Sequence, residues 1–227
     1  MTKILVIDDE PSITKLVSAY LEPEGYEVYT AADGNTGLKA ARAFKPDLII
    51  LDLMLPGIDG IELLSRLRRE SQVYVILLTA KTEETDKIVG LSVGADDYVT
   101  KPFSPRELTA RVKAALRRIQ TGSGLGSETS ILSFRHLRLD VGARTVSVDD
   151  KTIELTTIEF DLLKVLAENR GRVVTREQLL EKVWGGEYFG EMRVVDVHLG
   201  HVRQKIGRDD LVVTIRGIGY RFEDESL

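Results

Sequence analysis

Three aspartates directly follow short apolar runs, at positions where a parallel sheet would gather ligand-binding groups. Asp8 and Asp9 follow the run Ile4–Ile7, and Asp52 follows the run Leu48–Leu51. Uninterrupted apolar runs of this length are typical of strands buried on both faces. Carboxylates at the carboxyl ends of such strands stand where open α/β sheets bind their ligands. An aspartate that merely begins a loop explains any one of them alone, so the prediction depends on the other strand ends.

Two further strand ends add a hydroxyl and an ammonium group, because Thr79 ends the fourth apolar run and Lys101 follows the fifth. Three carboxylates packed together repel one another, and each would have its pKa raised unless a cation lies between them. Mg2+ takes one or two carboxylates, a carbonyl and several waters, and leaves room for phosphate oxygens. A carboxylate can also attack phosphorus, with Lys101 and Thr79 stabilising the developing charge. This edge of the sheet predicts phosphoryl chemistry that depends on Mg2+.

Five strand patterns alternate with five helix patterns over residues 1–120. The strands are expected at 4–7, 27–30, 48–51, 73–78 and 97–99, and the helices begin near residues 11, 34, 61, 82 and 104. Strict alternation favours a parallel sheet covered by helices on both faces. Five units in about 120 residues suit the flavodoxin-like, doubly wound strand order 2-1-3-4-5. The topological switch then lies between the first and third strands, which end in the three aspartates.

A second domain is expected after residues 121–130, TGSGLGSETS, whose Gly, Ser and Thr content predicts a flexible linker spanning about 17 Å. Residues 134–140 and 144–149 alternate apolar and polar side chains as antiparallel strands do, and a short strand is expected at 154–155. The remaining expected elements are helices at 156–168, 175–184 and 193–206, and a hairpin of strands at 212–215 and 219–222.

Composition excludes several kinds of chemistry. The 227 residues include no Cys and three His, which excludes disulfides and Cys-ligated metals and argues against a His-rich zinc site. Apolar runs reach about six residues, against the roughly 20 that span a bilayer, and no signal-peptide pattern opens the chain. We therefore expect a soluble, cytoplasmic protein with no membrane partner. The net charge is −5, so any DNA contact must be local, as in segment 193–221 with six Lys and Arg against three acids.

The motifs VIDDE, LDLMLPGIDG, LTA and VTKPF stand in that order within residues 1–120. Together they resemble the receiver domain of two-component response regulators. The resemblance implies that Asp52 is the phosphoacceptor for a sensor histidine kinase. It also implies that Mg2+ is held by Asp8, Asp9, Asp52 and the backbone carbonyl of Met54.

The same resemblance assigns roles to the later strand ends. Thr79 and Lys101 would contact the phosphoryl group, Tyr98 would be the switch aromatic, and the bond before Pro102 would be cis. The family implies no enzyme beyond Mg2+-dependent self-phosphorylation from a phosphodonor and slow self-dephosphorylation.

Other phosphate-binding α/β proteins fit less well. Haloacid-dehalogenase-like phosphatases carry a second Asp two residues after the nucleophile, whereas Met54 stands two residues after Asp52. A flavodoxin would place a Ser-, Thr- and Gly-rich phosphate loop after the first strand, where this chain has Asp-Asp-Glu-Pro. A phosphohydrolase with an accessory nucleic-acid domain remains the alternative, and turnover of a general phosphatase substrate would distinguish it.

Residues 131–227 resemble the winged-helix effector domain of the OmpR/PhoB subfamily. The resemblance runs through LTTIEFDLLKVLAEN, RVVTREQLLEKVWG, RVVDVHLGHVRQKIG and RGIGYRF. It implies a winged helix-turn-helix domain with an antiparallel sheet at its amino-terminal end. Promoter DNA and RNA polymerase are the implied partners.

Helix 193–206 is the expected major-groove element. Its periodicity predicts Val194, Val197 and Ile206 inward, and it predicts an outward face of Arg193, His198, His201, Arg203 and Lys205. Arg216, at the hairpin tip, would by resemblance reach an adjacent minor groove. A basic face that is merely solvated is the alternative.

The resemblance also implies a homodimer formed on phosphorylation through the fourth helix, fifth strand and fifth helix. The implied pairs across the two-fold axis are Lys87 with Glu107, Asp97 with Arg111 and Asp96 with Arg118. The apolar part of this surface comprises Ile88, Leu91 and Ala110. Because the linker is flexible, the two effector domains can bind a direct repeat.

Overall fold

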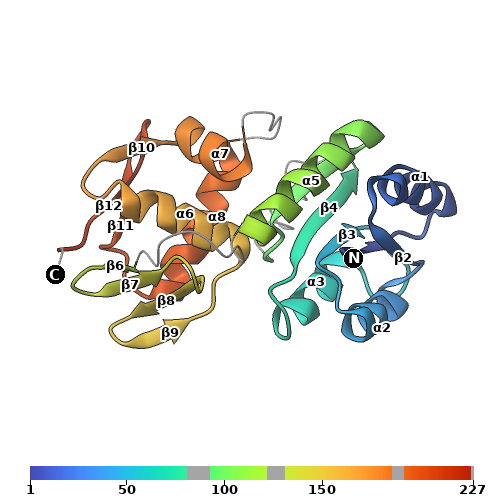
Figure 1. Ribbon diagram of the computed structural model, residues 1–227, viewed down its shortest axis with the longest axis horizontal. Coiled ribbons are helices and arrows are strands. Elements are labelled where there is room, and N and C mark those ends of the chain that lie inside the picture. Colours follow the sequence, from blue (N-terminus) through green and yellow to red (C-terminus); the bar gives the residue numbers. More distant parts are fainter. Residues whose placement is uncertain (81–92, 122–130, 186–191, 226–227) are drawn as a thin grey trace. The chain divides into compact units, whose positions relative to one another are not determined.

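The computed structural model describes residues 1–80, 93–121, 131–185 and 192–225. These residues form two compact units, Met1–Leu116 and Arg117–Leu227 (Figure 1). The expected helix at 82–93 and the expected linker at 121–130 lie, except for one residue each, outside the described residues. Each unit is described by itself.

The first unit is built on a parallel sheet with the strand order β2-β1-β3-β4-β5. This order confirms the flavodoxin-like prediction. The first and third strands, after which the aspartates come, are neighbours at the centre of the sheet. The strands are β1 (Lys3–Ile7), β2 (Glu27–Ala31), β3 (Leu48–Asp52), β4 (Tyr74–Ala80) and β5 (Asp97–Lys101).

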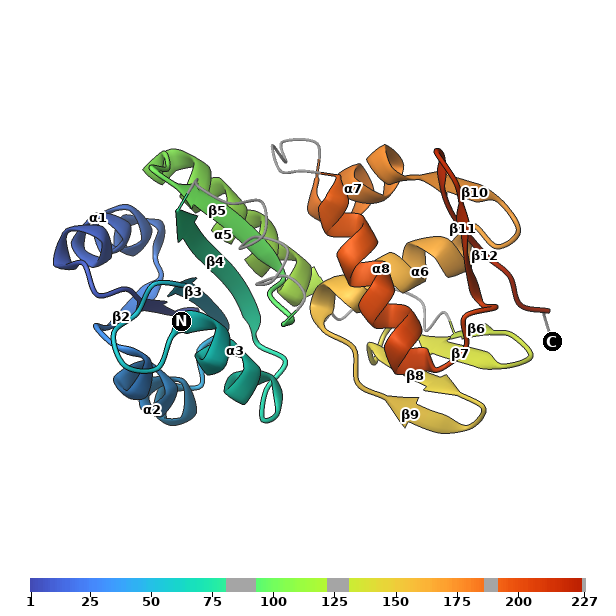
Figure 2. The same cartoon turned by 180° about the vertical axis from the view of Figure 1, so that it is seen from behind.

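Helices cover both faces of this sheet. Helices α1 (Pro11–Leu21) and α5 (Pro105–Thr121) lie on one face, and α2 (Gly34–Phe44) and α3 (Gly60–Arg68) lie on the other (Figures 1 and 2). A short 3-10 helix, η1 (Glu22–Glu24), follows α1. Two side chains cap helix starts: Asp33 accepts from the first-turn amides of α2, and Asp59 accepts from Glu62 N of α3 at 2.7 Å. Such caps satisfy amides that have no partner inside the helix.

The core of this unit is the apolar pair of central strands. Residues Ile4–Ile7 of β1 and Leu48–Leu51 of β3 are fully buried. Burying one such side chain stabilises the fold by about 1.5–3 kcal/mol, so these strands contribute much of the stability of the unit. Their carboxyl ends are therefore held rigidly, and so are the aspartates there.

After α5, the described residues of the second unit form two antiparallel sheets and three helices. The first sheet has the order β6-β7-β8-β9 and the second has the order β10-β12-β11. The first sheet comprises β6 (Ile131–Ser133), β7 (Leu137–Asp140), β8 (Thr145–Val148) and β9 (Lys151–Ile153). The remaining elements are α6 (Thr157–Glu168), β10 (Val173–Thr175), α7 (Arg176–Trp184), α8 (Arg193–Ile206), β11 (Val212–Ile215) and β12 (Gly219–Phe222). A sheet followed by three helices and a hairpin agrees with the expected winged-helix architecture.

Several boundaries of the first sheet differ from the sequence prediction. The run expected as one strand at 134–140 contains a turn, in which Phe134 N donates to Leu137 O at 2.8 Å. The turn separates β6 from β7. The strand expected at 154–155 lies three residues earlier, at β9, because it pairs with β8 after a tight turn at Asp149 and Asp150, both with positive φ. Strand β10 was not expected, and it forms through pairing with β12.

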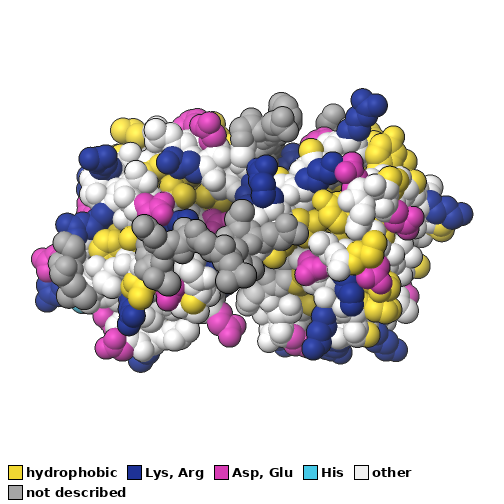
Figure 3. All heavy atoms as spheres, viewed as in Figure 1, with side chains coloured by type: hydrophobic (Ala, Val, Ile, Leu, Met, Phe, Trp, Pro, Cys, Tyr) yellow, Lys and Arg dark blue, Asp and Glu magenta, His cyan; other side chains and the backbone are white. Residues whose placement is uncertain are grey.

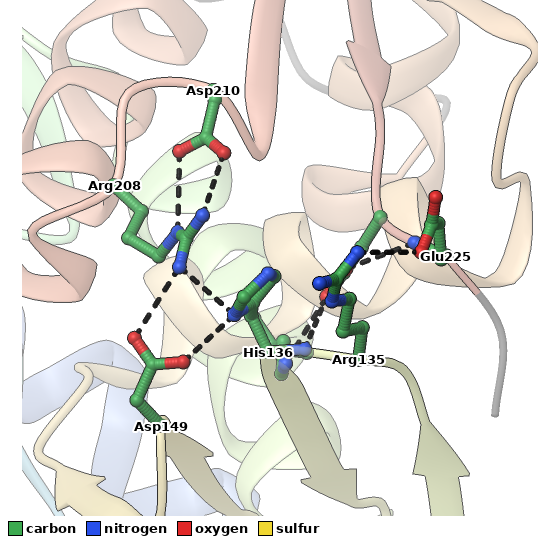
Figure 4. A network of polar contacts seen from close by, with 8 residues as sticks. Arg135, His136, Asp149, Arg208, Asp210 and Glu225 are labelled. Atoms are coloured by element: carbon green, nitrogen blue, oxygen red, sulfur yellow. Dashed lines mark hydrogen bonds and ion pairs between the residues drawn. The ribbon is translucent and has the colours of Figure 1, made fainter.

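A polar network joins the first sheet of this unit to the segment after α8 (Figure 4). Arg208 pairs with Asp210 at 2.9 Å and with Asp149 at 3.4 Å. Nδ1 of His136 lies 2.8 Å from Asp149 Oδ1 and 2.8 Å from Arg208 Nη1. One nitrogen cannot donate to the carboxylate and accept from the guanidinium at once, so the tautomer of His136 decides which contact is a hydrogen bond. Hydrogen bonding to His136, and then to Arg208, lowers the pKa of Asp149.

Candidate functional site

Asp8, Asp9 and Asp52 meet at the carboxyl edge of the parallel sheet. Each offers one carboxylate oxygen, and these three oxygens lie within 4.8 Å of one another. Asp8 and Asp52 are buried, with 1% and 3% of their surface exposed, whereas Asp9 is exposed. The cluster predicted from the strand ends therefore forms, and solvent reaches it from the side of Asp9.

Lys101 is the cation of this cluster. Its Nζ lies 2.9 Å from Asp8 Oδ2, 3.0 Å from Asp52 Oδ2 and 3.5 Å from Glu10 Oε1. Burial alone would lower the pKa of Lys101, but hydrogen bonds and charge attraction from Asp8 and Asp52 together outweigh burial and raise it. Lys101 therefore stays protonated and neutralises part of the cluster.

The donor set fits Mg2+. Burial raises the pKa of Asp8, against the lowering effects of Lys101 and of the Glu10 amide, which donates to Asp8 Oδ1 at 2.9 Å. A carboxylate whose charge is disfavoured by burial gains from a further nearby cation. The three oxygens are hard ligands, and the exposed side leaves positions for water, as Mg2+ prefers.

The loop after Asp52 is fitted closely between two helix starts. A Cβ at Gly60 would come within 2.3 Å of Asp52 O, and a Cβ at Gly34 would come within 2.3 Å of Ile58 O. Only glycine fits at these two positions, because both neighbours are backbone atoms. On the other side of the loop, the side chain of Met54 is 73% exposed.

The remaining predicted residues of this site come from β4 and β5. Thr79 and Tyr98 are buried, with 1% and 6% of their surface exposed. Residues 79 and 80 of β4 pair with Thr100 and Lys101, so Thr79 lies on the strand beside the Lys101 strand, at the same edge of the sheet. The peptide bond between Lys101 and Pro102 is cis, as the family resemblance implied.

The expected dimer surface is described only in part. Lys87, Ile88 and Leu91 lie outside the described residues. Ala110 is exposed, while Glu107, Arg111 and Arg118 are partly exposed. Within this one chain, Arg111 Nη1 lies 3.1 Å from both carboxylate oxygens of Asp97, and Arg111 Nη2 lies 2.9 Å from Glu107. Asp97, Arg111 and Glu107, which were expected to pair between subunits, thus pair within the subunit.

The expected surface positions of Asp96 and Asp97 are wrong, because both residues are buried, with 0% and 3% of their surface exposed. Asp96 Oδ2 accepts from Arg68 Nη2 at 2.8 Å and from Val75 N at 2.9 Å. Arg68 also donates to the carbonyls of Gly94 and Val73. A buried charge needs such partners. Arg68 and Val75 lie 28 and 21 residues before Asp96, so no local sequence pattern indicates these contacts.

The expected outward position of His198 on α8 is also wrong. His198 is 1% exposed, and the buried residues of the helix are Val194, Val195, His198, Leu199, Val202 and Ile206. Val197, expected inward, is only half-buried, whereas Arg193 and Gly200 are exposed. The buried stripe is wider than the sequence analysis supposed because α8 packs against both α6 and α7.

Three other candidate DNA-contacting side chains of α8 are bound inside the unit. Arg203 donates through Nε to Val212 O at 2.7 Å and through Nη2 to Thr214 Oγ1 at 2.6 Å. Lys205 Nζ lies 2.6 Å from Glu159 Oε2, and His201 Nδ1 lies 3.7 Å from Glu159 Oε1. In contrast, Arg216 is exposed in the hairpin between β11 and β12.

Two acidic residues that the sequence analysis did not single out hold α8 in place. Glu159 is one, and Asp196 is the other. Asp196 Oδ1 accepts from Arg176 Nε at 2.7 Å and from the Tyr220 hydroxyl at 2.5 Å. Burial, together with the hydrogen bond to Asp196, raises the pKa of Tyr220 to about 12. The sequence shows that Glu159 and Asp196 lie in amphipathic helices. It does not show their partners, because those come from other elements.

The charged side chains show no single-sign region on the face drawn in Figure 3. Lys and Arg side chains alternate there with Asp and Glu side chains over each of the two units. This face therefore carries no continuous basic patch of the kind that an extended basic field would produce.

Comparison with known proteins identifies the family. Residues 4–113 match the family "Response regulator receiver domain", and residues 150–222 match "Transcriptional regulatory protein, C terminal". The sensory transduction protein RegX3 of Mycolicibacterium smegmatis is 43% identical over 98% of this chain and 100% of its own. The alkaline phosphatase synthesis transcriptional regulatory protein PhoP of Bacillus subtilis is 45% identical over 99% of this chain and 98% of its own.

Solved structures agree. The response regulator DrrB of Thermotoga maritima, described as an OmpR/PhoB homolog, is 39% identical with a TM-score of 0.53 over 98% of this chain and 99% of its own. A mutant of RitR is 29% identical with a TM-score of 0.77 over the same shares.

The chain belongs to the two-component response regulators. Within them it combines a receiver domain with a DNA-binding domain of the OmpR/PhoB type, which confirms the resemblance seen in the motifs. A receiver domain implies a histidine kinase partner, and the second domain implies DNA. Proteins of this architecture are transcription regulators and generally not enzymes in the usual sense. Among the described helices, none combines the length and the apolar content that crossing a membrane requires.

Proposed function

We propose that this protein is a DNA-binding transcription regulator switched by phosphorylation of Asp52. The single observation that carries the proposal is the position of the Asp52 carboxylate. It lies at the carboxyl end of β3, 3.0 Å from Lys101 and within 4.8 Å of oxygens from Asp8 and Asp9. A nucleophilic carboxylate beside a fixed ammonium group and a metal-binding set is what phosphoryl transfer to an acid requires.

The residues of the site then divide the tasks of phosphoryl transfer among them. An Asp52 oxygen forms the new bond to phosphorus as the bond from phosphorus to the kinase's histidine nitrogen breaks. Lys101 and Thr79 bind the phosphoryl oxygens, and Tyr98 is the switch aromatic. Asp8, Asp9, Asp52 and the carbonyl of Met54 would hold Mg2+. When bound, Mg2+ supplies charge neutralisation for the incoming phosphoryl group.

Acetyl phosphate as donor tests this assignment. Wild-type protein with Mg2+ should shift on a phosphate-affinity gel, and Asp52→Asn should not. Asp47→Asn is the matched control, because Asp47 stands at the opposite end of the same strand. A shifted Asp52→Asn protein would refute the phosphoacceptor. Steady turnover of a general phosphatase substrate would instead support a phosphohydrolase.

The domain division that fits this function is a receiver at 1–120, a flexible linker at 121–130 and a winged-helix domain at 131–227. Phosphorylation would favour a homodimer through the fourth helix, β5 and α5. A flexible linker would leave the effector domains free to bind head to tail, although the receiver dimer is two-fold symmetric. Binding of the second domain is then favoured by its effective concentration.

DNA binding is proposed for α8 in the major groove and for the β11–β12 hairpin in the minor groove. The exposure of Arg193 and Arg216 supports this arrangement. His201, Arg203 and Lys205 contribute through their positions on α8, and His198 is left out because it is buried. RNA polymerase is the proposed downstream partner.

Footprinting of the phosphorylated protein on DNA selected from a random pool tests the DNA arrangement. The expected optimum is a direct repeat with half-sites about 10–11 base pairs apart, so that both lie on one face of the duplex. Binding should weaken steeply with salt, because phosphate contacts dominate affinity. A palindromic optimum would contradict the head-to-tail arrangement.

A further inference from the structure

The first turn of α6 carries a buried carboxylate that does more than cap its helix. Glu159 is 1% exposed. Its Oε2 accepts from Thr156 N at 2.8 Å, and Glu159 N donates to Thr156 Oγ1 at 3.4 Å, which completes a capping box. The same Oε2 lies 2.6 Å from Lys205 Nζ, and Oε1 lies 3.7 Å from His201 Nδ1. Both of these partners belong to α8.

The neighbouring helix α7 shows that capping does not need the charge. Its capping box uses Gln178, whose Oε1 accepts from Thr175 N at 3.0 Å while Gln178 N donates to Thr175 Oγ1 at 3.2 Å. Gln178 is exposed and neutral. Burying a carboxylate is costly unless it is paired. A charged residue at the buried position of α6 therefore indicates a second task, and the described ion-pair contacts of Glu159, to Lys205 and His201, both lie on α8.

His201 and Lys205 are placed so that their contacts with Glu159 can fix the orientation of α8. His201 and Lys205 are four residues apart and so lie on one side of α8. That side faces α6, which α8 crosses (Figure 2). A carboxylate that contacts two side chains one turn apart restrains both the rotation of α8 about its axis and its sliding along α6. At the other end of α8, Asp196 is held by Arg176 and Tyr220.

We propose that Glu159 is a positioning residue for DNA reading, which holds α8 through Lys205 and His201 so that its exposed side meets the bases in register. The proposal rests on the proposed role of α8 in the major groove. On this account Lys205 and His201 act as anchors of the helix rather than as readers of bases.

The sign of one substitution separates positioning from simple electrostatics. Glu159→Gln removes one negative charge, which by itself strengthens binding to a polyanion of any sequence. It keeps the cap, because Gln178 serves the same purpose in α7. Loss of the contact to Lys205 and His201 should instead weaken binding to the preferred sequence. Charge and position thus predict opposite changes.

The test uses the full-length protein and two duplexes. One is selected by the wild type from a random pool, and the other has the same composition in scrambled order. Glu159→Gln should lose about fivefold or more in affinity for the selected duplex, as a misplaced base contact does. Its affinity for the scrambled duplex should stay the same or rise. Glu168→Gln is the matched control on the same helix, because Glu168 is exposed, and it should change both affinities by less than about twofold.

A double variant separates the loss of the contact from the change in net charge. Glu159→Gln combined with Lys205→Gln has the net charge of the wild type. Binding to the scrambled duplex should return to the wild-type level, while binding to the selected duplex stays weak. Full recovery of binding to the selected duplex would overturn the positioning role, as would a parallel rise of both affinities in Glu159→Gln.

Amide hydrogen exchange decides the contact without DNA. Glu159→Gln should exchange faster along α8 than the wild type, with α7 unchanged. Unchanged exchange along α8 would overturn the proposal. If the wild type selects no preferred duplex, the proposed DNA-reading function fails, and the exchange result still decides whether Glu159 holds α8.

Discussion

The ammonium group of Lys101 lies 3.0 Å from a carboxylate oxygen of Asp52. The same group lies 2.9 Å from Asp8 Oδ2, so a single positive charge is shared between two buried acids. Asp9 adds a third carboxylate at the exposed side. The cluster therefore keeps an excess of negative charge that the protein itself does not neutralise, and its stability should depend on pH and on divalent cations.

Asp8→Asn should raise the thermal stability of the protein in EDTA at neutral pH. Burial raises the pKa of Asp8 above 3.8, so the folded state favours its neutral form. The stability gained from neutral Asp8 is present below its ordinary pKa and is lost as the pH rises through the raised pKa. Asn at this position stays neutral at every pH, so the variant keeps this stability. Its advantage in melting temperature should thus be largest at neutral pH and should vanish as the pH falls toward 3.8.

Mg2+ should reverse this order. A ligand that binds only the folded state stabilises it by mass action. Millimolar Mg2+ should raise the melting temperature of the wild type and of the control Asp47→Asn, but should raise that of Asp8→Asn much less. An equal Mg2+ response in all three proteins would contradict the metal site.

Ala110→Arg should prevent the dimer that phosphorylation is proposed to cause. Ala110 is exposed on α5, so the substitution leaves the fold intact and adds bulk and charge to the expected interface. Exposed ion pairs contribute only about 0–1 kcal/mol each, so the apolar contacts must supply much of the affinity. Sedimentation of the acetyl-phosphate-treated proteins measures this. Ala43→Arg is the control, because Ala43 is exposed on α2, outside the expected interface, and this variant should still dimerise.

The arrangement of strands in the first unit was predictable because it depends on local patterns. The runs Ile4–Ile7 and Leu48–Leu51, together with the acids that follow them, specify both the sheet and the cluster. The positions of Asp96 and His198 were not predictable. Buried Asp96 pairs with the guanidinium of Arg68, 28 residues away. His198 is buried because α6 and α7 pack against α8. Such partners are brought together only by the tertiary fold, and helical spacing alone does not reveal how wide a buried stripe is.

Arg203→Ala and Arg216→Ala should behave differently. Arg203 donates to Val212 O and Thr214 Oγ1, so its loss should reduce the free energy of unfolding by about 1–3 kcal/mol. Arg216 is exposed at the hairpin, so its loss should leave stability unchanged, weaken DNA binding and reduce the salt slope by about 1. Denaturant unfolding and a salt series of binding measurements check both. A stable Arg203→Ala protein would contradict the anchoring of β11.

Tyr220 should ionise later than an ordinary tyrosine. Its pKa is raised to about 12, whereas an ordinary tyrosine has a pKa of 10.0. Because the pKa of Tyr220 is raised in the folded protein, the contribution of its hydroxyl to stability is complete below pH 10.0. That contribution is lost as the pH rises toward about 12. Absorbance of tyrosinate during alkaline titration should show a late step that Tyr220→Phe lacks.

Tyr220→Phe should reduce the free energy of unfolding by about 1–3 kcal/mol at neutral pH, because Asp196 loses the hydrogen bond from the Tyr220 hydroxyl. Tyr20→Phe is the control, because Tyr20 is 42% exposed on α1. It should keep the late step and the wild-type stability. A late step that persists in Tyr220→Phe would assign it to another tyrosine.

The loop from Leu53 to Asp59 lies directly against the starts of α2 and α3. Backbone oxygens of Asp52 and Ile58 lie 2.3 Å from where a Cβ at Gly60 or Gly34 would be, so neither position has room for a side chain. Met54, in the same loop, is exposed. A side chain at Gly34 or Gly60 would therefore have to displace this loop, and with it the segment that follows Asp52. The two glycines thus keep the backbone beside the candidate phosphoacceptor close to both helix starts.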